Sequence, residues 1–190
     1  LDSTEIRQIV RMNLDGSLDK TYRFNTATNK GNIGANGQVD TYMHTDADKL
    51  EKLVVFGNFN TFDGQAAGRI IRLNADGTID PTFNTGSGAD NQIFSLIYNA
   101  TTKKYMMTGS FTKYNGKTAI GIAMLNEDGT LDESFTAKAL DGGYASFAKQ
   151  LNSGLIVLSG AFKKYNNVTR NGFMILNSKG DLAAGYNTTG

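Results

Sequence analysis

Short runs of apolar residues recur along the chain, and polar turns separate them. Residues 53–56 (Leu-Val-Val-Phe) and 173–176 (Phe-Met-Ile-Leu) are apolar at every position. A strand with one face in water alternates apolar and polar residues, so these runs predict strands that are covered on both faces. Residues 39–44 and 93–98 follow a more alternating pattern. The chain is therefore predicted to form many short strands and almost no helix.

A repeat organises these strands. Gly57, Gly109 and Gly160 each open a Gly-x-Phe segment, and successive glycines lie 52 and 51 residues apart. An aromatic residue and a turn-forming pair follow each segment, namely Phe62-Asp63-Gly64, Tyr114-Asn115-Gly116 and Tyr165-Asn166-Asn167. A second motif begins at Leu73, Leu125 and Leu176, and an earlier copy of it begins at Met12. Because order and spacing are kept, the chain is built from copies of one supersecondary unit.

Each unit predicts four antiparallel strands, which we call A to D. Strand A is the alternating segment, B and C are the apolar runs, and D is a short strand that ends at an aromatic residue. Asp-Gly, Asn-Gly and Asn-Asn pairs favour two-residue hairpins because both central residues of a type I′ turn have positive φ. We expect such turns between B and C at residues 63–64, 115–116 and 166–167, and further turns between C and D at residues 76–77 and 128–129. Such short connections exclude a parallel sheet.

A small antiparallel sheet that is covered on both faces and repeated at a fixed period is typical of a propeller blade. The predicted fold class is all-β, a β-propeller of four-stranded antiparallel blades that repeat every 51 to 52 residues. The motif phenylalanines and leucines are expected to be equivalent and buried between blades: Phe59, Phe111, Phe162, Leu73, Leu125 and Leu176.

We expect a single propeller-type domain over residues 1–190. It would contain a half-blade at residues 6–24 and blades at residues 39–83, 91–135 and 144–186. About 3.5 blades are fewer than the usual four to eight, so we expect a piece of a larger ring or of a longer chain. The alternative is an open arc whose unpaired sheet edges are covered by a partner chain.

The composition excludes several kinds of site. Among 190 residues there are 22 Gly but one Pro, no Cys and no Trp. A chain without Cys has no disulfide scaffold, no zinc site with Cys ligands and no Cys nucleophile. Its 19 basic and 18 acidic residues are scattered, whereas nucleic-acid surfaces carry a clustered basic face. No apolar stretch approaches the roughly 18 residues of a membrane span, so we expect neither nucleic acid nor a membrane span.

The order Gly-x-Phe, aromatic-Asn-Gly, Leu-Asn-x-Asp-Gly-Thr-Leu-Asp-x-Ser-Phe resembles the bacterial delta-60 repeat family. The resemblance covers residues 6–186, with departures in the last copy, where Lys179 and Ala183 replace aspartates. That family is a β-propeller-type domain of unassigned function, found in large secreted and surface proteins. The resemblance implies a β-propeller fold and an extracellular or cell-surface location in a bacterium, and it implies no catalytic residues.

The Asp-Gly turns share part of the spacing of a calcium loop. Asn74, Asp76, Gly77 and Asp80 fall at positions 3, 5, 6 and 9 of such a loop, but its first and last positions would be an arginine and a phenylalanine. We favour a structural role, in which the Asn and Asp side chains bind local backbone N–H groups. His44 is the only histidine and no second ligand converges on it, so we expect a structural histidine, no metal site and no cofactor.

Glycoside hydrolysis would require two carboxylates about 5 to 10 Å apart. Most aspartates lie in the repeated turns, whereas a catalytic residue is expected to break the repeat. Three acids lie outside those turns, at or near the loops that lead from strand D to the next strand A: Asp40, Asp90 and Asp141. The first two occupy similar places in the repeat, which favours a structural role for them as well.

Aromatic residues at the B–C turns give the remaining signal for a ligand site. Tyr rings stack on sugars, and neighbouring Asn and Lys bind sugar hydroxyls. If this face binds glycan, Tyr114 and Tyr165 are exposed there. The alternative, which their repetition favours, is that each aromatic packs over its own hairpin. The candidate ligand-binding residues are Phe62, Lys113, Tyr114, Asn115, Lys163 and Tyr165.

These observations favour a non-enzymatic binding or adhesion module of a secreted or surface-attached bacterial protein, with a glycan or a protein as ligand. Two alternatives stay open. One is a carbohydrate-active enzyme whose catalytic acids lie on the D–A loops or on blades outside this chain, and the other is a passive spacer. The expected partners also include further blades of the same parent chain, or a chain that pairs with a free sheet edge.

Overall fold

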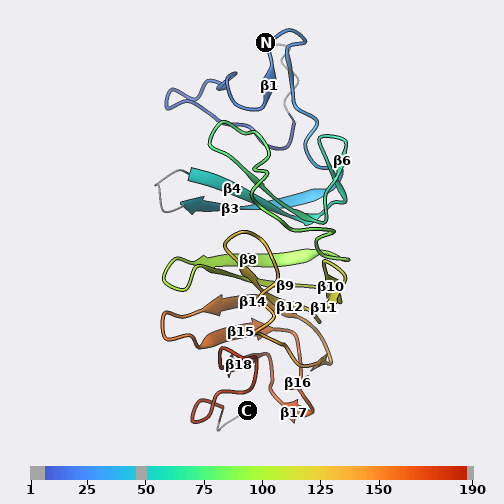
Figure 1. Ribbon diagram of the computed structural model, residues 1–190, viewed down its shortest axis with the longest axis vertical. Coiled ribbons are helices and arrows are strands. Elements are labelled where there is room, and N and C mark those ends of the chain that lie inside the picture. Colours follow the sequence, from blue (N-terminus) through green and yellow to red (C-terminus); the bar gives the residue numbers. More distant parts are fainter. Residues whose placement is uncertain (1–6, 46–50, 188–190) are drawn as a thin grey trace. The chain divides into compact units, whose positions relative to one another are not determined.

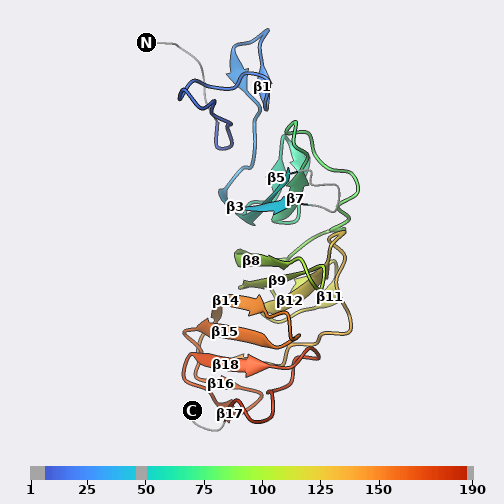
Figure 2. The same cartoon turned by 90° about the vertical axis from the view of Figure 1, so that its left-hand side faces the viewer.

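The computed structural model describes residues 7–45 and 51–187. Within these ranges all regular secondary structure is β, and no helix is long and apolar enough to span a membrane. The chain divides into two compact units, residues 1–81 and residues 82–190, and each is described by itself. Figure 1 and Figure 2 show the strands of both units from two directions.

The main sheet of the first unit is antiparallel and three-stranded, with the strand order β3-β4-β7. Its strands are β3 (Gln38–Thr45), β4 (Glu51–Asn58) and β7 (Ile70–Leu73), which correspond to the predicted strands A, B and C. Strand D consists of a single bridge between Leu73 and Ile79. We call this sheet the first blade.

The segment that precedes the first blade has little regular structure. A bridge between Met12 and Leu18 forms at the place where the half-blade is expected. A short hairpin follows, in which β1 (Phe24–Asn25) pairs with β2 (Lys30–Gly31).

The second unit contains two sheets with the same strand order. The second blade consists of β8 (Ile93–Asn99), β9 (Lys104–Gly109) and β12 (Ile122–Asn126). The third blade consists of β14 (Ala145–Gln150), β15 (Ile156–Gly160) and β18 (Phe173–Leu176). Strand D is again a single bridge in each blade, between Leu125 and Leu131 in the second and between Leu176 and Leu182 in the third. The predicted order of four antiparallel strands is thus confirmed, with an outermost strand of minimal length.

The B–C connections differ from the prediction. The turn pairs do not join strands B and C directly, because each closes a separate small hairpin inserted between them. These hairpins are β5 (Thr61–Phe62) with β6 (Gln65–Ala66), β10 (Lys113–Tyr114) with β11 (Lys117–Thr118), and β16 (Lys164–Tyr165) with β17 (Val168–Thr169). In the first blade, for example, the pairing of B with C stops at Phe56 and Ile70, and the residues between them fold into the extra hairpin.

Each small hairpin is paired with the loop that leads into its own blade. Ala35 bridges Phe62, Ala89 bridges Tyr114, and in the third blade the contact extends to a strand, β13 (Leu140–Asp141), beside β16. The B–C insertion and the D–A loop therefore form one continuous layer at one end of every blade. The B–C insertion keeps its length in all three blades, whereas the D–A loop before the first blade is longer than the other two.

The expected turn chemistry is confirmed. Asp63 and Gly64 have φ of 50° and 78°, and Asn115 and Gly116 have φ of 46° and 76°, as a type I′ turn requires. The third pair, residues 166–167, also has positive φ at both positions. The C–D turns are wider, because their Asp has negative φ and the chain closes through the bond from the N–H of the glycine to the Asn three residues earlier, 2.8 Å in the first blade.

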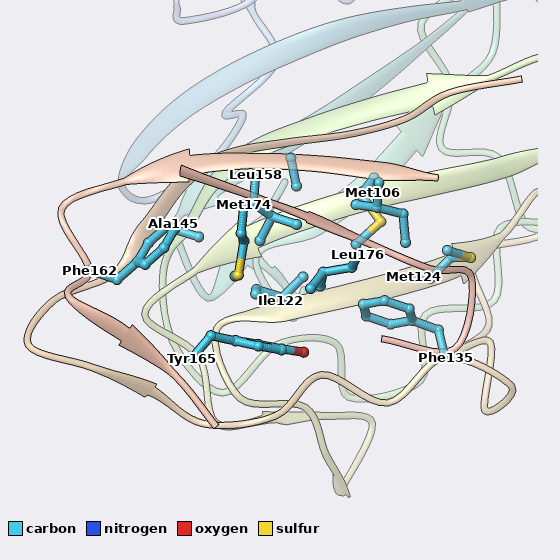
Figure 3. Packing of buried hydrophobic residues seen from close by; sticks show 12 residues of the cluster. Met106, Ile122, Met124, Phe135, Ala145, Leu158, Phe162, Tyr165, Met174 and Leu176 are labelled. Atoms are coloured by element: carbon cyan, nitrogen blue, oxygen red, sulfur yellow. The ribbon is translucent and has the colours of Figure 1, made fainter. Parts of the chain in front are cut away.

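The core of the second unit lies between its two sheets (Figure 3). Met106, Ile122 and Met124 of the second blade pack against residues of the third blade that include Leu158 and Leu176. All six motif residues that were expected to be buried are buried: Phe59, Phe111, Phe162, Leu73, Leu125 and Leu176. In the first and second blades, consecutive apolar residues in strands B and C are therefore explained by burial on both faces of the sheet. The prediction is wrong for residues 173–176, where burial alternates and Phe173 is 56% exposed.

The repeated Gly-x-Phe glycines stand where strand A crosses closest to strand B. A Cβ at Gly109 would lie 2.2 Å from the carbonyl oxygen of Gln92, and one at Gly160 would lie 2.2 Å from that of Tyr144. Strands β8 and β14 each have a register irregularity beside this contact. Any side chain here would push the two strands apart, so the glycine is set by close approach.

A second kind of repeated glycine contacts the aromatic residue of the preceding repeat. A Cβ at Gly77 would lie 2.9 Å from the ring of Tyr22, and a Cβ at Gly129 would lie 2.9 Å from the ring of Phe83. Tyr22 and Phe83 each end the preceding copy of the C–D motif. The C–D turns of the first and second blades are therefore covered by a ring that the previous repeat supplies, whereas Gly180 of the third blade lies against the backbone of Thr136 instead.

Candidate functional site

The aromatic residues proposed for ligand stacking are buried. Phe62 is 1% exposed, Tyr114 is 0% exposed and Tyr165 is 1% exposed. The expected exposure of these rings is wrong, because the D–A loop pairs over each small hairpin and covers the ring beneath it. The alternative, in which the aromatic packs against its own hairpin, describes the structure.

The two tyrosine hydroxyls have a structural role. Tyr114 donates to the carbonyl of Gly129 at 2.8 Å, and Tyr165 donates to the carbonyl of Gly180 at 2.5 Å. Burial raises the pKa of Tyr165 to about 12, and it raises the pKa of Tyr114 as well, so both phenols keep their protons. Each hydroxyl links the small hairpin to the C–D turn of the same blade.

The first blade makes the same link with different residues. Phe62 has no hydroxyl, and the guanidinium of Arg23 donates instead to the carbonyl of Gly77 at 3.0 Å. Arg23 also lies 4.5 Å from the centre of the Phe62 ring and forms a two-pronged bond to the carboxylate of Asp63 at 2.7 and 2.9 Å. The buried glycine carbonyl thus has a donor in all three blades.

The other three candidate residues are exposed but do not surround a ring. Asn115 accepts a hydrogen bond from the Ser87 N–H at 3.2 Å, which ties the hairpin to the D–A loop. The aliphatic stem of Lys163 lies against Gly142, where an added Cβ would come within 3.0 Å. Lys113 is also exposed. With the aromatic rings buried, these side chains lack the stacking surface that a sugar site on this face requires.

The Asx residues of the C–D turns bind backbone groups and hydroxyls. Asp76 accepts hydrogen bonds from the N–H of Thr78 at 2.9 Å and from its hydroxyl at 2.6 Å, and Asn74 donates to the same hydroxyl at 3.0 Å. The same pattern recurs around Asp15 and Asp128. These carboxylates are engaged within the turn, which is the structural role that the sequence favoured over a calcium loop.

His44 is buried on strand β3, with 1% of its surface exposed. Among the residues that the structure describes, no three His, Cys, Asp or Glu side chains come together as a metal-binding group. His44 therefore belongs to no such group within these ranges.

The acids of the D–A region occupy three different settings. Asp90 accepts bonds from the Thr112 N–H, the Thr112 hydroxyl and the Lys113 N–H at 2.8, 2.7 and 3.0 Å. Burial alone would raise its pKa, but these hydrogen bonds outweigh it and lower the pKa. Asp141 lies exposed on β13, and Asp40 lies exposed on β3 beside a cleft. Asp90 is thus a loop anchor, and only Asp40 faces an open site.

That cleft lies within the first unit and has a volume of about 550 Å³. On one side is the segment around Gln8 and Arg11, and on the other is strand β3 with its neighbour β4. Val39, Met43 and Leu53 supply apolar surface, and the polar groups come from Gln8, Arg11, Asp40, Thr41, Glu51 and Asn74. An open cleft with an apolar lining and a few polar groups is the usual form of a ligand site.

Two of the polar side chains in the cleft are held in place. Arg11 bonds to Asp19 at 2.7 Å and to the carbonyl of Ala75 at 2.8 Å, and it lies 4.6 Å from the centre of the Tyr22 ring. Hydrogen bonds from the Thr21 hydroxyl and N–H, and then from Arg11, lower the pKa of Asp19 to about 2. Arg11 is therefore a fixed cation beside a fixed ring.

Gln8 bridges the N-terminal segment to the loop before β3. Its amide donates to the carbonyl of Gly37 at 2.7 Å and accepts from the N–H of Ala35 at 3.0 Å. Sequence reasoning had singled out Asp40 here, but it missed Gln8 and Arg11. Both come from the irregular leading segment, and only folding brings that segment against β3.

The blades, their strand order and their repeat define this chain as an all-β protein of the β-propeller class. Two segments, residues 52–83 and 103–135, match the family described as Domain of unknown function (DUF5122) beta-propeller. Each segment ends at the aromatic residue that closes strand D. No curated protein and no solved structure matches the chain. The expectation of a β-propeller repeat family is confirmed at this level.

Proposed function

We propose that this protein is a non-enzymatic binding module of a secreted or surface-attached bacterial protein, and that its ligand is a glycan held in the cleft of the first unit. The single observation that carries the proposal is the cleft itself, where apolar side chains lie beside uncharged and charged hydrogen-bonding groups. Sugar rings present the same mixture, with C–H faces and a rim of hydroxyls.

The position of the cleft supports a role other than stability. The repeated aromatics and aspartates are buried or bonded in every blade, so they are engaged in the fold. Asp40, Thr41 and Met43 are exposed on β3 instead. Since the leading segment is irregular, the surface that it forms with β3 is not reproduced at the other blades.

The carboxylates of the cleft do not suit glycoside hydrolysis. Asp40 stands opposite Phe56, whereas Glu51 stands opposite Thr45. Five residues of strand separate these two positions, which at about 3.4 Å per residue is roughly 17 Å. Hydrolysis of a glycosidic bond requires carboxyl groups about 5 to 10 Å apart. This spacing favours binding over catalysis.

The experiment is a glycan array with the whole chain, followed by titration of any hit against the wild type and Asp40→Asn. Loss of the charged acceptor should weaken binding about tenfold, the effect of one hydrogen bond to a charged group. Asp141→Asn is the matched control, since it changes an exposed aspartate of the second unit.

Three outcomes would overturn the proposal. The first is an array without hits, and the second is a hit that Asp40→Asn binds as tightly as the wild type. The third is release of sugar product on prolonged incubation, which would indicate the enzyme alternative, most clearly if Asp141→Asn abolished it. Binding only to a protein would replace the glycan part of the proposal.

A further inference from the structure

A second cavity lies within the second unit, at the junction of its two blades. Its volume is about 320 Å³. It is lined by Thr102, Lys104, Met124, Asp132, Ser134, Gln150, Ser178 and Lys179. Seven of these eight side chains are polar or charged, although the neighbouring core is apolar. A pocket of this size has room for several waters or for one small polar ligand.

Two residues of the lining differ from their equivalents in the other blades. Gln150 lies opposite Ile156 on β15, the place that Tyr98 has opposite Tyr105 in the second blade. Met43 has this place in the first blade, opposite Leu53. Lys179 takes the turn position that aspartate occupies in the other three copies: Asp15, Asp76 and Asp128. Lys179 departs from an otherwise constant aspartate, and Gln150 is the one amide at a place that holds methionine or tyrosine in the other two blades, so the lining of this cavity is chemically distinct from its equivalents.

The amide of Gln150 is not fully satisfied by the protein. The residue is 7% exposed, and its Oε1 accepts from the Thr102 hydroxyl at 2.5 Å. Its Nε2 has only the thioether sulfur of Met124, at 4.0 Å, as an acceptor among the described residues. Sulfur is a weak acceptor, so the amide has a capacity for a further hydrogen bond at the cavity. If the amide were reversed, its oxygen would face the same sulfur, which donates no hydrogen, and the group left unsatisfied would be an acceptor.

The cavity also has an excess of positive charge. Lys104 is paired with Asp132 at 2.9 Å and donates to Asn126 at 2.5 Å. Lys179 is exposed, and no described carboxylate lies within ion-pair distance of its ammonium group. Counting Lys104, Lys179 and Asp132, the lining carries one net positive charge. A singly charged anion fits this balance better than a dianion, which Asp132 would repel.

We propose that this cavity binds a small carboxylate ligand of monosaccharide size, an acidic sugar, with Lys179 on the carboxylate and Gln150 on a neighbouring polar group. Ser134 and Ser178 supply further hydroxyls for the ring substituents. This site shares no residue with the cleft of the first unit, so the two proposals are independent of each other.

The test is a calorimetric titration of the whole chain with glucuronate, with glucose and inorganic phosphate as comparison probes. Glucuronate should bind saturably at one site, and glucose and phosphate should bind at least about tenfold more weakly, because each lacks one feature the site selects. Lys179→Asp should weaken glucuronate about tenfold or more, since an attractive charge becomes repulsive. Gln150→Met, which keeps the side-chain length, should weaken it several-fold.

The variants are chosen to fold. Lys179→Asp restores the residue of the other three turns, and methionine occupies the equivalent of Gln150 in the first blade. Lys149→Asp is the matched control, because this exposed lysine lies on the same strand and points to the opposite face of the sheet. It should bind glucuronate like the wild type.

The proposal fails if the wild type shows no saturable binding of glucuronate, or if glucose or phosphate binds equally well. It also fails if Lys179→Asp and Gln150→Met retain wild-type affinity. Should Lys179→Asp not fold, Gln150→Met alone decides the question. Asp40→Asn must leave this titration unchanged, which distinguishes failure here from failure of the first-unit cleft.

Discussion

The second and third blades share a backbone at their outer corner but use different side chains there. In the second blade the N–H of Asp132 bonds to the carbonyl of Met124 at 2.8 Å, and in the third blade the N–H of Ala183 bonds to that of Ile175 at 2.9 Å. Asp132 pairs with Lys104, the residue before Tyr105 on β9. The equivalent residues of the third blade are Ala183 and Leu155, so the ion pair is replaced by apolar groups at both positions.

This difference shows that the corner does not need an ion pair. Bringing two charges out of water costs about as much as their attraction returns, so an apolar pair is an equivalent solution. A corner with one partner missing is a different matter, since it leaves an isolated charge. The repeat accordingly keeps both charged residues or neither.

A substitution in the first blade gives the strongest test of this rule. Asp80 has a side chain that is 2% exposed, and it pairs with Arg72 at 2.7 Å and Lys52 at 3.0 Å. Asp80→Ala should lower the free energy of unfolding by about 3 to 5 kcal/mol, because two cations would lose their buried partner. Urea unfolding followed by far-ultraviolet circular dichroism measures the loss.

Asp181→Ala is the control for this measurement. Its side chain is 56% exposed and lies 3.7 Å from Lys138, so the variant should cost about 0 to 1 kcal/mol. If Asp80→Ala were no more harmful than Asp181→Ala, the buried corner would not be important for stability.

The second and third blades share a buried tyrosine hydroxyl that bonds to a glycine carbonyl, and its removal should have the next largest effect on stability. Tyr114→Phe removes the hydroxyl with which the small hairpin donates to the buried carbonyl of Gly129. Because that carbonyl would lose its described donor, the variant should lower the free energy of unfolding by about 1 to 3 kcal/mol. Tyr186→Phe, at a ring that is 58% exposed, should be close to neutral. Equal stability of the two variants in thermal melts would contradict the proposed link.

A double-mutant cycle tests whether the charged corner can be converted into the apolar one. Lys104→Leu and Asp132→Ala are each expected to destabilise the second blade, and the double variant should recover part of the loss. The coupling energy should be about 1 to 2 kcal/mol, as for other residues in direct contact. Additive losses in urea unfolding would mean that the two charges act independently.

The smallest expected effect is a loss of stability at low pH that depends on Asp132. Burial would raise the pKa of Asp132, but hydrogen bonds from the Ser134 hydroxyl and from Lys104 outweigh it and lower the pKa below the ordinary 3.8. A lowered pKa in the folded state stabilises the protein above the unfolded value, and this contribution is lost as the pH falls through the folded value. The urea midpoint should therefore decline below about pH 4, and less steeply in the Lys104→Leu, Asp132→Ala double variant. Parallel declines would show that Asp132 does not contribute.

The sequence predicted the strands well because two local signals agree. Consecutive apolar residues in strands B and C require both faces to be covered, and the Asp-Gly and Asn-Gly pairs have the positive φ that their chemistry favours. The small hairpins were missed because each of their strands has only two residues, too few for an apolar–polar pattern, and their pairing with the D–A loop is a long-range contact. Only the bridges, such as that from Ala89 to Tyr114, reveal it.

The sequence was a poorer guide to the candidate sites. Tyr114 and Tyr165 have residue types suited to binding sugars, but burial depends on the loop that covers them. Their exact place in every repeat was the better signal, since it indicated a structural role. The residues that line the two cavities, such as Arg11 and Gln150, have no motif around them. Lys179 was visible as a departure from the repeat, but nothing local connected it with Gln150.

Two C–D turns are covered by an aromatic ring from the preceding repeat, Gly129 by Phe83 and Gly77 by Tyr22. This order has a consequence for folding during biosynthesis. Each ring belongs to the repeat made before the turn that it covers, so the ring stays uncovered until the turn has left the ribosome. Domains fold from the N-terminus as they emerge, but here the ring that ends one repeat is buried only when the turn of the next repeat has been made. Nascent chains stalled before Gly129 should therefore be more open to protease at Phe83 than chains stalled beyond the turn.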